Sequence, residues 1–409
     1  MEDADRTGRV TRGALRGARR GGCGRGAAVS RCAVCGAGFP PVAAALGVCA
    51  ACARSGRADV DAHVRAVHSR SRRAFGLPAA PPRAPDGARC GLCMNLCSIG
   101  PGQRGYCGLR RNLAGRPVGG RPAEGRLSWY YDPLPTNCVA DWVCPGGTGA
   151  GYPAFAHRPG PEVGFANLAV FYEACSFNCL FCQNWHFRQA GPGGRETTAR
   201  DLAARADGRT ACICFFGGDP SPQMLHSIQA ARLARRRAGG GILRICWETN
   251  GSMHPRLLDR ALDLALESGG CIKFDLKAWD EGLHRALAGV SNAWTLRNFA
   301  RAAARFRERP VPPALVASTL LVPGYVDVAE VGRIARFVAE QDPDIPYSLL
   351  AFYPCFLLED LPTTSRREAL AAAEAARVAG LRRVRIGNEH LLRDEACTEL
   401  GAPTAAPSL

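Results

Sequence analysis

The feature that most limits what this chain can fold into is a series of short apolar runs, from about residue 165 onward, each followed by an amphipathic segment. Continuous apolar runs are typical of parallel strands that are buried on both faces, and the segments between them suit crossover helices. Six or seven such units predict an α/β fold, a partial (open) β/α barrel of about six units. The expected strands are, in chain order, NLAVFY, ACICFFG, LRICWETN, CIKFDLK, ALVASTLLV, YSLLAFYP and VRIGN.

Chemistry in such folds is found at the carboxyl ends of the strands. The unusual residues of this chain follow the expected strands in the same way. The first strand leads into CSFNCLFC, and later strands lead into GGDP, ETN, DLK and VPG. We therefore expect these short stretches to lie close together and to form the site.

The stretch CSFNCLFC holds three cysteines in eight residues, Cys175, Cys179 and Cys182. Disulfides need pairs of cysteines, and closed zinc sites need four ligands. A cubane 4Fe-4S cluster held by only three thiolates keeps one iron free for another ligand, and Phe181 can lie against a flat ligand beside it. The alternative is a three-cysteine zinc site completed by a distant histidine.

CSFNCLFC resembles the signature of the radical S-adenosylmethionine (radical SAM) superfamily. The resemblance implies that Cys175, Cys179 and Cys182 hold a 4Fe-4S cluster whose open iron chelates the amino and carboxylate groups of S-adenosylmethionine. An electron from the reduced cluster then cleaves the sulfonium to methionine and a 5′-deoxyadenosyl radical, which abstracts a hydrogen atom. The protein contributes orientation and the exclusion of water.

Two further stretches agree with this resemblance. FFGGDP is similar to the Gly-Gly-Glu segment of the superfamily, so Gly217 and Gly218 are expected to approach the methionine amino group closely through their backbone. Asp219 replaces the usual glutamate, which is tolerable where the backbone makes most of the contact. The alternative, a tight strand-to-helix turn, would explain the glycines but not why they lie at this place. In WETNG, Glu248 or Asn250 is expected to bind the ribose hydroxyls.

The chain contains only two lysines among its many arginines, Lys273 and Lys277. A position that keeps lysine in such a sequence indicates a need for a compact ammonium group. Asp275 and Lys277 are expected on one face of a strand, because alternate residues point the same way. By resemblance to glycyl-radical activating enzymes, Lys277 neutralises the S-adenosylmethionine carboxylate. For Lys273, deeper on the same face, we expect a structural role.

Within the superfamily the chain looks like the pyruvate formate-lyase-activating-enzyme-like group, and closest to the radical enzyme of the AmmeMemoRadiSam system. The likeness covers about residues 90–395 and rests on NCVADWVCPGG, FCQNW, GGDPSPQ, KFDLKAW, LVPGYVD and GNEH. The sixth unit departs from the pattern, because it offers Ser348 and Tyr353 where well-studied activating enzymes carry a histidine. This departure leaves their substrate, a glycyl-radical enzyme, open for this chain.

Two groups of four cysteines precede the barrel. The first has the spacing C-x2-C-x13-C-x2-C, which predicts a four-thiolate zinc ribbon. It consists of Cys32, Cys35, Cys49 and Cys52. The second is unequally spaced and is predicted to bind zinc or a second iron–sulfur cluster. It consists of Cys90, Cys93, Cys97 and Cys107.

The remaining cysteines and histidines carry weaker signals. Cys138 and Cys144 either join a site or are buried free thiols. His186 and His390 lie near motifs, where structural roles and positions in the cavity are both open, and His157 lies near the second half of the extension. Cysteines inside expected strands are predicted to be core residues: Cys212, Cys214, Cys246 and Cys271. No pattern includes Cys23, Cys355 or Cys397.

The formal net charge is +16. Because the bias toward Ala, Gly, Pro and Arg runs through the whole chain, we attribute this charge to composition and expect no nucleic-acid partner. No apolar run is long enough for a membrane span, and the N-terminus lacks the apolar region of a secretory signal. We expect a cytoplasmic protein, because dense cysteine without a signal indicates metal or redox chemistry in a reducing compartment.

The sequence divides into five parts. Residues 1–30 are a disordered Arg/Gly-rich leader, residues 31–75 a zinc-ribbon-like module with a helix, and residues 76–164 a linker and a second cysteine-rich extension. Residues 165–395 are the radical SAM core, and residues 396–409 a flexible tail.

We therefore expect a radical SAM enzyme with a 4Fe-4S cluster, S-adenosylmethionine and zinc as cofactors. The resemblance implies an electron donor of the flavodoxin or ferredoxin type and leaves the substrate open, a protein among the candidates. The alternative is a zinc-binding scaffold on a degenerate barrel, which would bind no S-adenosylmethionine. A third reading, an electron-transfer iron–sulfur protein, conflicts with three-thiolate ligation.

Overall fold

The computed structural model describes residues 30–190 and 196–394. The expected leader (residues 1–30, except its last residue) and the expected tail (residues 396–409) lie outside the described residues. Cys23 and Cys397 lie there as well.

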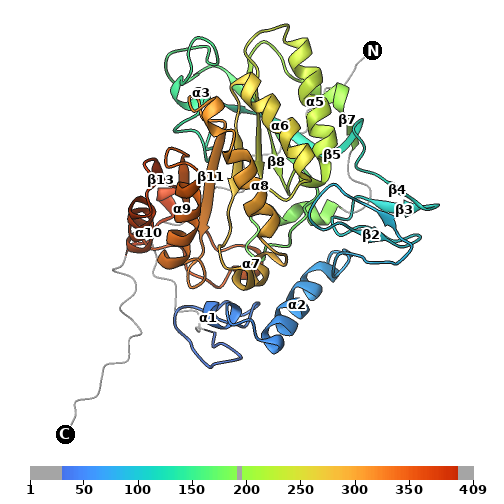
Figure 1. Cartoon of the computed structure of the whole chain (residues 1–409), viewed down its shortest axis with the longest axis vertical. Helices are drawn as coiled ribbons and strands as arrows, with labels where there is room; N and C mark the ends of the chain where they lie inside the picture. The colour runs from blue at the N-terminus through green and yellow to red at the C-terminus, as the bar shows by residue number, and fades with distance from the viewer. Residues whose placement is uncertain (1–29, 191–195, 395–409) are drawn as a thin grey trace, which may run out of the picture.

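A nine-stranded sheet forms the centre of the molecule (Figure 1). Seven of its strands are parallel and follow one another across the sheet in chain order, so the crossovers wind in one direction, as in a β/α barrel. The two edge strands do not pair, so the sheet stays open, which confirms the predicted α/β fold with an open parallel sheet. The parallel strands are β6 (Ala166–Tyr172), β8 (Thr210–Gly217), β9 (Arg244–Thr249), β10 (Ile272–Asp275), β11 (Leu315–Leu321), β12 (Tyr347–Ala351) and β13 (Val384–Gly387).

Two further strands extend the sheet beyond β6. β5 (Glu124–Pro133) pairs antiparallel with β6, and β7 (Glu196–Thr198) pairs antiparallel with β5. The sequence had indicated an ordered extension here but no strand. Two small antiparallel pairs lie outside the main sheet: β1 (Ala88–Arg89) with β2 (Ser98–Ile99), and β3 (Arg111–Leu113) with β4 (Arg116–Val118).

Helices fill the crossovers between the parallel strands. They are α4 (Ala199–Ala203), α5 (Met224–Arg237), α6 (Pro255–Ser268), α7 (Glu281–Ala288), α8 (Ala293–Ala303), α9 (Val328–Gln341) and α10 (Arg366–Val378). The extension contributes α1 (Ala50–Ala53), α2 (Ala58–Arg73) and α3 (Pro145–Thr148). Short 3₁₀ turns are η2 (Trp185–Ala190), η3 (Ser221–Gln223), η4 (Phe306–Glu308), η5 (Phe356–Leu358) and η6 (Glu389–Leu391).

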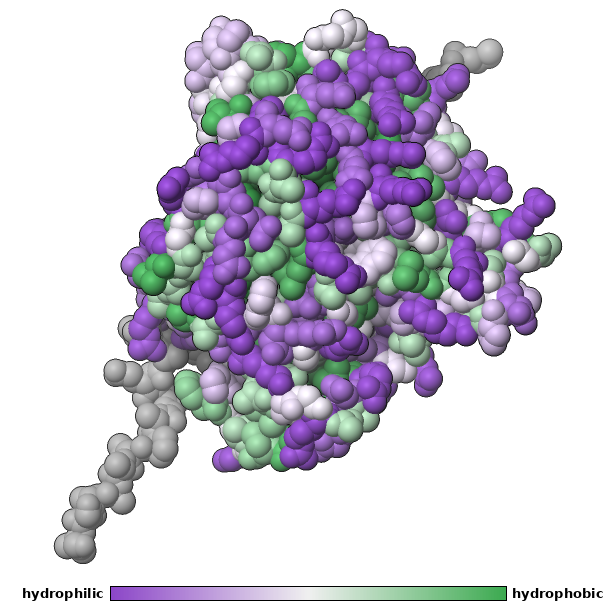
Figure 2. Space-filling view, viewed as in Figure 1, coloured by the Kyte–Doolittle hydropathy of each residue, from purple (hydrophilic) through white to green (hydrophobic). Residues whose placement is uncertain are grey.

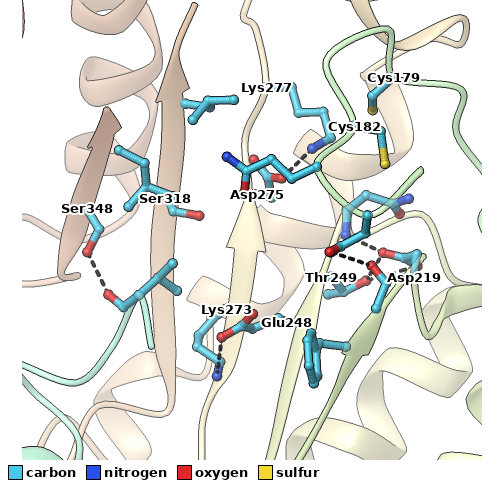
Figure 3. Close-up of a pocket in the computed structure, with 18 of the residues that line it drawn as sticks. Cys179, Cys182, Asp219, Glu248, Thr249, Lys273, Asp275, Lys277, Ser318 and Ser348 are labelled. Atoms are coloured by element: carbon cyan, nitrogen blue, oxygen red, sulfur yellow. Dashed lines mark hydrogen bonds and ion pairs between the residues drawn. The ribbon is translucent and has the colours of Figure 1, made fainter. Parts of the chain in front are cut away.

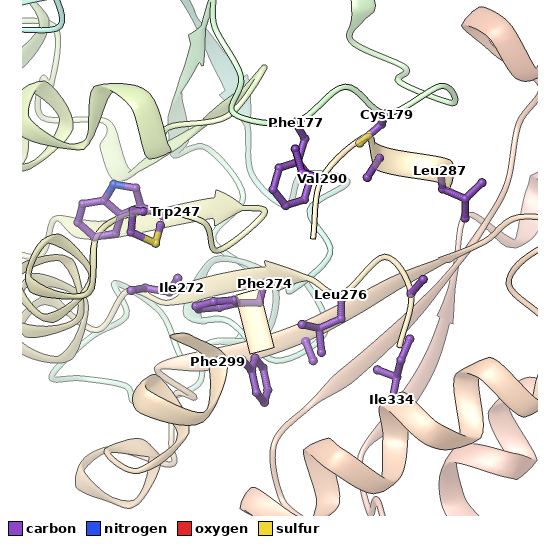
Figure 4. Packing of buried hydrophobic residues seen from close by; sticks show 14 of the residues in the cluster. Phe177, Cys179, Trp247, Ile272, Phe274, Leu276, Leu287, Val290, Phe299 and Ile334 are labelled. Carbon is purple, nitrogen blue, oxygen red and sulfur yellow. The ribbon is translucent and has the colours of Figure 1, made fainter. Parts of the chain in front are cut away.

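Strand β10 shows how the sheet separates core from site. Its alternate residues point to opposite faces. Phe274 packs on the helix side against Phe299 of α8, with ring centroids 5.4 Å apart (Figure 4). Lys273 and Asp275 face the other way and line a cavity. The inner face of the open barrel is therefore polar, while the outer face is covered by packed helices.

The N-terminal module lies beside α7, at the base of the view in Figure 1. Tyr325 fixes it to the barrel, because its buried hydroxyl donates to the carbonyl of Val48 and accepts from the amide of Ala43, both at 3.0 Å. Arg54 adds an ion pair with the buried carboxylate of Glu330 at 3.3 Å. The module and the barrel therefore share one core.

Figure 2 shows hydrophilic residues spread over the helical face, with apolar residues scattered between them, as expected where helices face water. Within the described parts of the chain, every helix is too short or too polar to cross a membrane.

Candidate functional site

A cavity of about 350 Å³ opens at the carboxyl ends of the parallel strands. Side chains from several strands and loops point into it (Figure 3). Every strand from β8 to β13 contributes at least one lining residue, and so does the loop after β6. These are the strand ends at which the sequence predicted the chemistry.

The loop after β6 brings three thiols to this cavity: Cys175, Cys179 and Cys182. The loop is held by its neighbours, since the amide of Asn178 donates to the carbonyl of Ala288 at 2.8 Å. Phe177 of this loop lies beside Val290 in Figure 4, and both are buried. The position of the cysteines is thus set by packing against the end of α7.

Burial makes these thiols hard to ionise without a positive partner. It raises the pKa of Cys179 to about 12, although Lys277 acts in the opposite direction. Arg188, also on the cavity wall, opposes the rise for Cys182. A cationic metal core is the group that would favour three thiolates here, so the donor set fits a cluster held by Cys175, Cys179 and Cys182.

The loop after β8 meets the cysteine loop through glycines. Gly217 has φ +111°, and a Cβ on Gly218 would lie 2.4 Å from the carbonyl oxygen of Ala174. The amide of Gly218 donates to the carbonyl of Tyr172 at 2.8 Å. Glycine is therefore required at both positions, and it leaves the backbone edge exposed to the cavity.

Asp219 follows these glycines and is buried. Its carboxylate accepts hydrogen bonds from the amides of Ser221 and Asn250, both at 2.7 Å, and from the hydroxyl of Thr249 at 3.1 Å. Burial raises its pKa, and these hydrogen bonds only partly offset the rise. The carboxylate thus joins the ends of β8 and β9, a role that depends on its short side chain.

The two residues predicted for the ribose have different surroundings. Glu248 lies on the cavity wall and pairs with Lys273 at 2.8 Å (Figure 3). Burial raises the pKa of Glu248, but Lys273 outweighs this effect and the pKa is lowered. The amide of Asn250 instead faces the cysteine loop, 3.0 Å from the Ser176 hydroxyl and 3.8 Å from the Cys175 thiol.

Lys277 and Asp275 form an ion pair at the cavity (Figure 3). The Lys277 ammonium also lies 5.4 Å from the centre of the Phe181 ring. Burial lowers the pKa of Lys277, but Asp275 and the thiols outweigh it, so the pKa is raised. The cavity therefore holds a fixed positive charge beside the three cysteines.

On the far wall, Ser348 was noted from the sequence, but the residues around it were not. Trp142 donates to the hydroxyl of Ser348 at 3.0 Å, and Arg385 pairs with Asp141 at 2.6 Å. All four line the cavity. Tyr353, which was considered together with Ser348, is largely exposed. Two features of the sequence pointed to this wall: the missing histidine in the sixth β/α unit and the stretch NCVADWVC.

A smaller cavity of about 120 Å³ continues beneath the first one. The cysteines of the inner strands and the extension surround Lys273 there: Cys138, Cys144, Cys212, Cys214, Cys246 and Cys271. The Lys273 ammonium lies 3.1 Å from the thiols of both Cys138 and Cys214. Cys355 approaches the carbonyl of Cys182 at 3.7 Å but is not among the residues that line either cavity.

The three histidines near motifs pack on aromatic rings or stay at the surface. His186 stacks on Trp185 at 4.1 Å, and His157 stacks on Phe165 at 4.2 Å. His390 is exposed. The part of the chain that the structure describes shows none of the three among the residues lining the larger cavity.

The first four-cysteine group forms a compact site away from the cavity. Its thiols all lie within 4.8 Å of one another: Cys32, Cys35, Cys49 and Cys52. The sulfurs of Cys35 and Cys49 are 3.7 Å apart. This separation fits a metal ion at the centre of four thiolates, because ligands ~2.3 Å from a tetrahedral ion lie ~3.8 Å from each other.

Residues 169–338 match the Radical SAM superfamily. Pyruvate formate-lyase 1-activating enzyme of Escherichia coli (strain K12) is 30% identical over 143 residues, 34% of this chain and 54% of that protein. Isethionate sulfite-lyase activating enzyme of Oleidesulfovibrio alaskensis is 32% identical over 145 residues, 34% of this chain and 41% of that protein. The chain thus spans about half the length of these curated relatives.

A longer alignment joins the chain to an uncharacterized protein of Methanocaldococcus jannaschii, 25% identical over 327 residues, 77% of this chain and 86% of that protein. Among solved structures, a domain of a pyruvate-formate lyase-activating enzyme from Bacteroides vulgatus is 21% identical with a TM-score of 0.35. That match covers 43% of this chain and 98% of the domain. A likeness of this size adds nothing to the fold seen in Figure 1.

The open parallel sheet and the cysteine-lined cavity at its strand ends define the class of the molecule, an α/β fold with a candidate cofactor site. The match of residues 169–338 shows that this part of the chain is similar to the Radical SAM superfamily. Part of the chain is also similar to the activating enzymes of pyruvate formate-lyase and isethionate sulfite-lyase.

Proposed function

We propose that this enzyme binds a 4Fe-4S cluster through Cys175, Cys179 and Cys182 and cleaves S-adenosylmethionine reductively. One observation carries the proposal: the three thiols, the exposed backbone edge at Gly218 and the buried ammonium of Lys277 line one cavity. When bound, the reduced cluster supplies the electron that converts S-adenosylmethionine to methionine and a 5′-deoxyadenosyl radical, which takes a hydrogen atom from the substrate.

Different residues of the cavity bind different parts of S-adenosylmethionine. Lys277 pairs with the carboxylate of S-adenosylmethionine, for which its fixed charge is suited. The backbone at Gly217 and Gly218 accepts its amino group, and Phe181 lies against it. Glu248 faces the ribose hydroxyls with the oxygen that Lys273 leaves free. Packing of the cysteine loop against α7 orients the ligand and excludes water.

The substrate class is activating-enzyme-like, and we favour a protein. The similarity of the chain to the activating enzymes of pyruvate formate-lyase and isethionate sulfite-lyase supports this class. We propose that the chain itself is the radical enzyme of the AmmeMemoRadiSam system, within the activating-enzyme-like group. Trp142, Ser348 and Arg385 on the far wall are the contacts we assign to the substrate. The electron donor is of the flavodoxin or ferredoxin type.

We further propose that the first four-cysteine group holds zinc. The sulfur separation of 3.7 Å between Cys35 and Cys49 supports a tetrahedral ion. Its placement against Tyr325 supports a structural role. A reducing, low-oxygen cytoplasm suits the enzyme, because every cysteine in the described part of the chain is unpaired.

Anaerobic reconstitution with iron and sulfide, followed by a reductant and S-adenosylmethionine, tests the central proposal. The wild type is expected to form 5′-deoxyadenosine, and Cys179→Ala to form none. Cys212→Ala, at a partly buried cysteine of β8 outside the larger cavity, is the matched control and should keep the activity. The proposal fails if the wild type forms no 5′-deoxyadenosine or if Cys179→Ala is fully active.

The protein substrate is tested separately. A deuterated candidate protein should pass deuterium to 5′-deoxyadenosine when it is incubated with the enzyme. Deuterium transfer from small molecules alone would exclude the activating-enzyme-like role while leaving the cleavage chemistry intact.

A further inference from the structure

The second four-cysteine group is a folded site outside the cavity. The pairing of β1 with β2 brings Cys90 beside Cys97, whose carbonyl accepts from the Cys90 amide at 2.8 Å. The amide of Tyr106 donates to the Cys97 thiol at 3.4 Å and so brings the neighbouring Cys107 to the same place. Between them, Leu96 adopts φ +39°, a conformation rare for leucine. The backbone is therefore strained in the turn between Cys93 and Cys97.

The thiols of this group are not gathered as tightly as those of the first group. Among the described residues, only the first group has three or more ligand atoms that all lie within 4.8 Å of one another. A cubane of four irons and four sulfides is larger than one ion and holds its thiolates further apart.

The three-cysteine loop provides an internal comparison. Its thiols also line one site, and they too lie outside the 4.8 Å limit that the first group meets. In the described part of the chain, the first group thus meets this limit, and neither the second group nor the three-cysteine loop does. The second group resembles the loop of the radical SAM core in this respect and differs from the zinc-like site.

A buried cation lies beside this second group. Arg72 on α2 is 1% exposed, and in the described parts of the chain it has no carboxylate partner. Its guanidinium donates to the carbonyls of Pro78, at 2.6 Å, and Tyr106, and it lies 3.4 Å over the Tyr106 ring. An unpaired buried charge is costly. Iron–sulfur clusters at Cys107 and at the three-cysteine loop would supply the missing countercharge, because a cluster together with its thiolate ligands carries a net negative charge.

The second group and the three-cysteine loop are joined directly. The side-chain amide of Asn95, between Cys93 and Cys97, donates to the carbonyl of Ser176 at 2.8 Å, and Ser176 follows Cys175 in the chain. The amide of Met94, in the same turn, donates to the carbonyl of Ser252 at 2.9 Å. A hydrogen bond of 2.6 Å between the hydroxyls of Ser176 and Ser252 closes the link. The second group is therefore attached to the loop that the core uses.

We propose that Cys90, Cys93, Cys97 and Cys107 hold a second, fully ligated iron–sulfur cluster that serves electron transfer. Four thiolates leave no open iron, so this cluster binds no substrate, and its redox step moves one electron from a flavodoxin- or ferredoxin-type donor without making or breaking a bond. The step in which this cluster passes its electron to the three-cysteine loop rests on the proposed function. The presence of the cluster is independent of the proposed function.

A triple variant, Cys175→Ala with Cys179→Ala and Cys182→Ala, isolates the second group. After anaerobic reconstitution we expect about four irons and about one zinc per chain, with a visible absorption band and an electron paramagnetic resonance signal after dithionite reduction. Retention of about two zincs and no iron would overturn the proposal, as would the absence of any metal from the second group. The result is independent of whether the wild type cleaves S-adenosylmethionine.

Two additions to the triple variant keep the test decisive. Cys97→Ala should remove the remaining iron, whereas Cys212→Ala should not, with circular dichroism recording the fold of each.

Arg72→Gln should retain the iron but lower the reduction potential of the remaining cluster, because a buried cation that favours the more negative state is lost. An unchanged potential would count against Arg72 as its countercharge, and retention of all iron in the Cys97→Ala addition would count against the ligand set.

Discussion

The carboxylate of Asp219, in the loop after β8, accepts a hydrogen bond of 2.7 Å from the amide of Asn250 at the end of β9. The same carboxylate accepts from the amide of Ser221 at 2.7 Å. Because Asn250 in turn contacts the cysteine loop, Asp219 connects three strand ends through one side chain. Asp219 therefore braces the site, because its carboxylate holds the neighbouring loops through hydrogen bonds.

Replacing Asp219 by alanine should destabilise the protein. The substitution leaves two buried amides without an acceptor, which we expect to lower the free energy of unfolding by roughly 2–4 kcal/mol. Denaturant unfolding of the protein without its cluster measures this directly. The exposed Asp86→Ala should stay within about 0.5 kcal/mol of the wild type. Equal stabilities of the two variants would refute the bracing role of Asp219.

Replacing Lys277 by methionine should weaken S-adenosylmethionine binding without loss of the cluster. The variant removes the ammonium and leaves Asp275 unpaired beside the ligand carboxylate. We expect affinity to fall about 10- to 100-fold, roughly 1.4–3 kcal/mol. Equilibrium dialysis with labelled S-adenosylmethionine measures the affinity, and iron analysis checks the cluster.

Lys277→Arg is the matched control, since it keeps the charge but not the compact ammonium. Its affinity should lie between those of the wild type and Lys277→Met. Wild-type affinity in Lys277→Met would remove Lys277 from the binding site.

The parallel strands could be predicted from the sequence because each is buried on both faces and therefore reads as an apolar run. β5 (Glu124–Pro133) could not, since its residues alternate irregularly between buried and exposed positions near the edge of the sheet. The cysteine loop and Lys277 were recognisable from local spacing. Trp142 and Arg385 were not, because they reach the cavity only through the tertiary path of their segments.

The role proposed for Arg72 could not be predicted from the sequence either. In a chain this rich in arginine, one more arginine on a helix carries no signal. Its meaning comes from burial against Tyr106 and from the absence of a carboxylate partner among the described residues. Both are properties of packing, which a single sequence does not reveal.

Loosening the N-terminal module should lower stability but spare the chemistry. Tyr325→Phe removes the hydroxyl that bonds Ala43 and Val48, and leaves a buried amide and carbonyl unsatisfied. We expect a loss of roughly 1–3 kcal/mol in the free energy of unfolding, with iron content unchanged. Removal of metal from the first group by Cys35→Ser should lower the melting temperature in the same direction. A variant that loses iron together with zinc would contradict the separation of the two sites.

Acid should weaken the contact between α2 and the cysteine loop through His68. The buried ring of His68 lies 3.0 Å from the carbonyl of Ala286 and 2.9 Å from the side-chain amide of Asn178. Burial lowers the pKa of His68 from 6.5 to about 4. A histidine whose pKa is depressed by folding stabilises the protein fully above its unfolded pKa, and this contribution is lost as the pH falls from 6.5 through 4.

His68→Gln should therefore flatten the pH dependence of stability in this window. The wild type should lose about 3 kcal/mol more than the variant between pH 6.5 and 4, because the shift of the pKa sets that difference. Urea unfolding at a series of pH values measures it. Arg65→Gln, on the exposed side of the same helix, should follow the wild-type curve. Parallel curves for the wild type and His68→Gln would show that His68 is not held neutral by its contacts with Asn178 and Ala286.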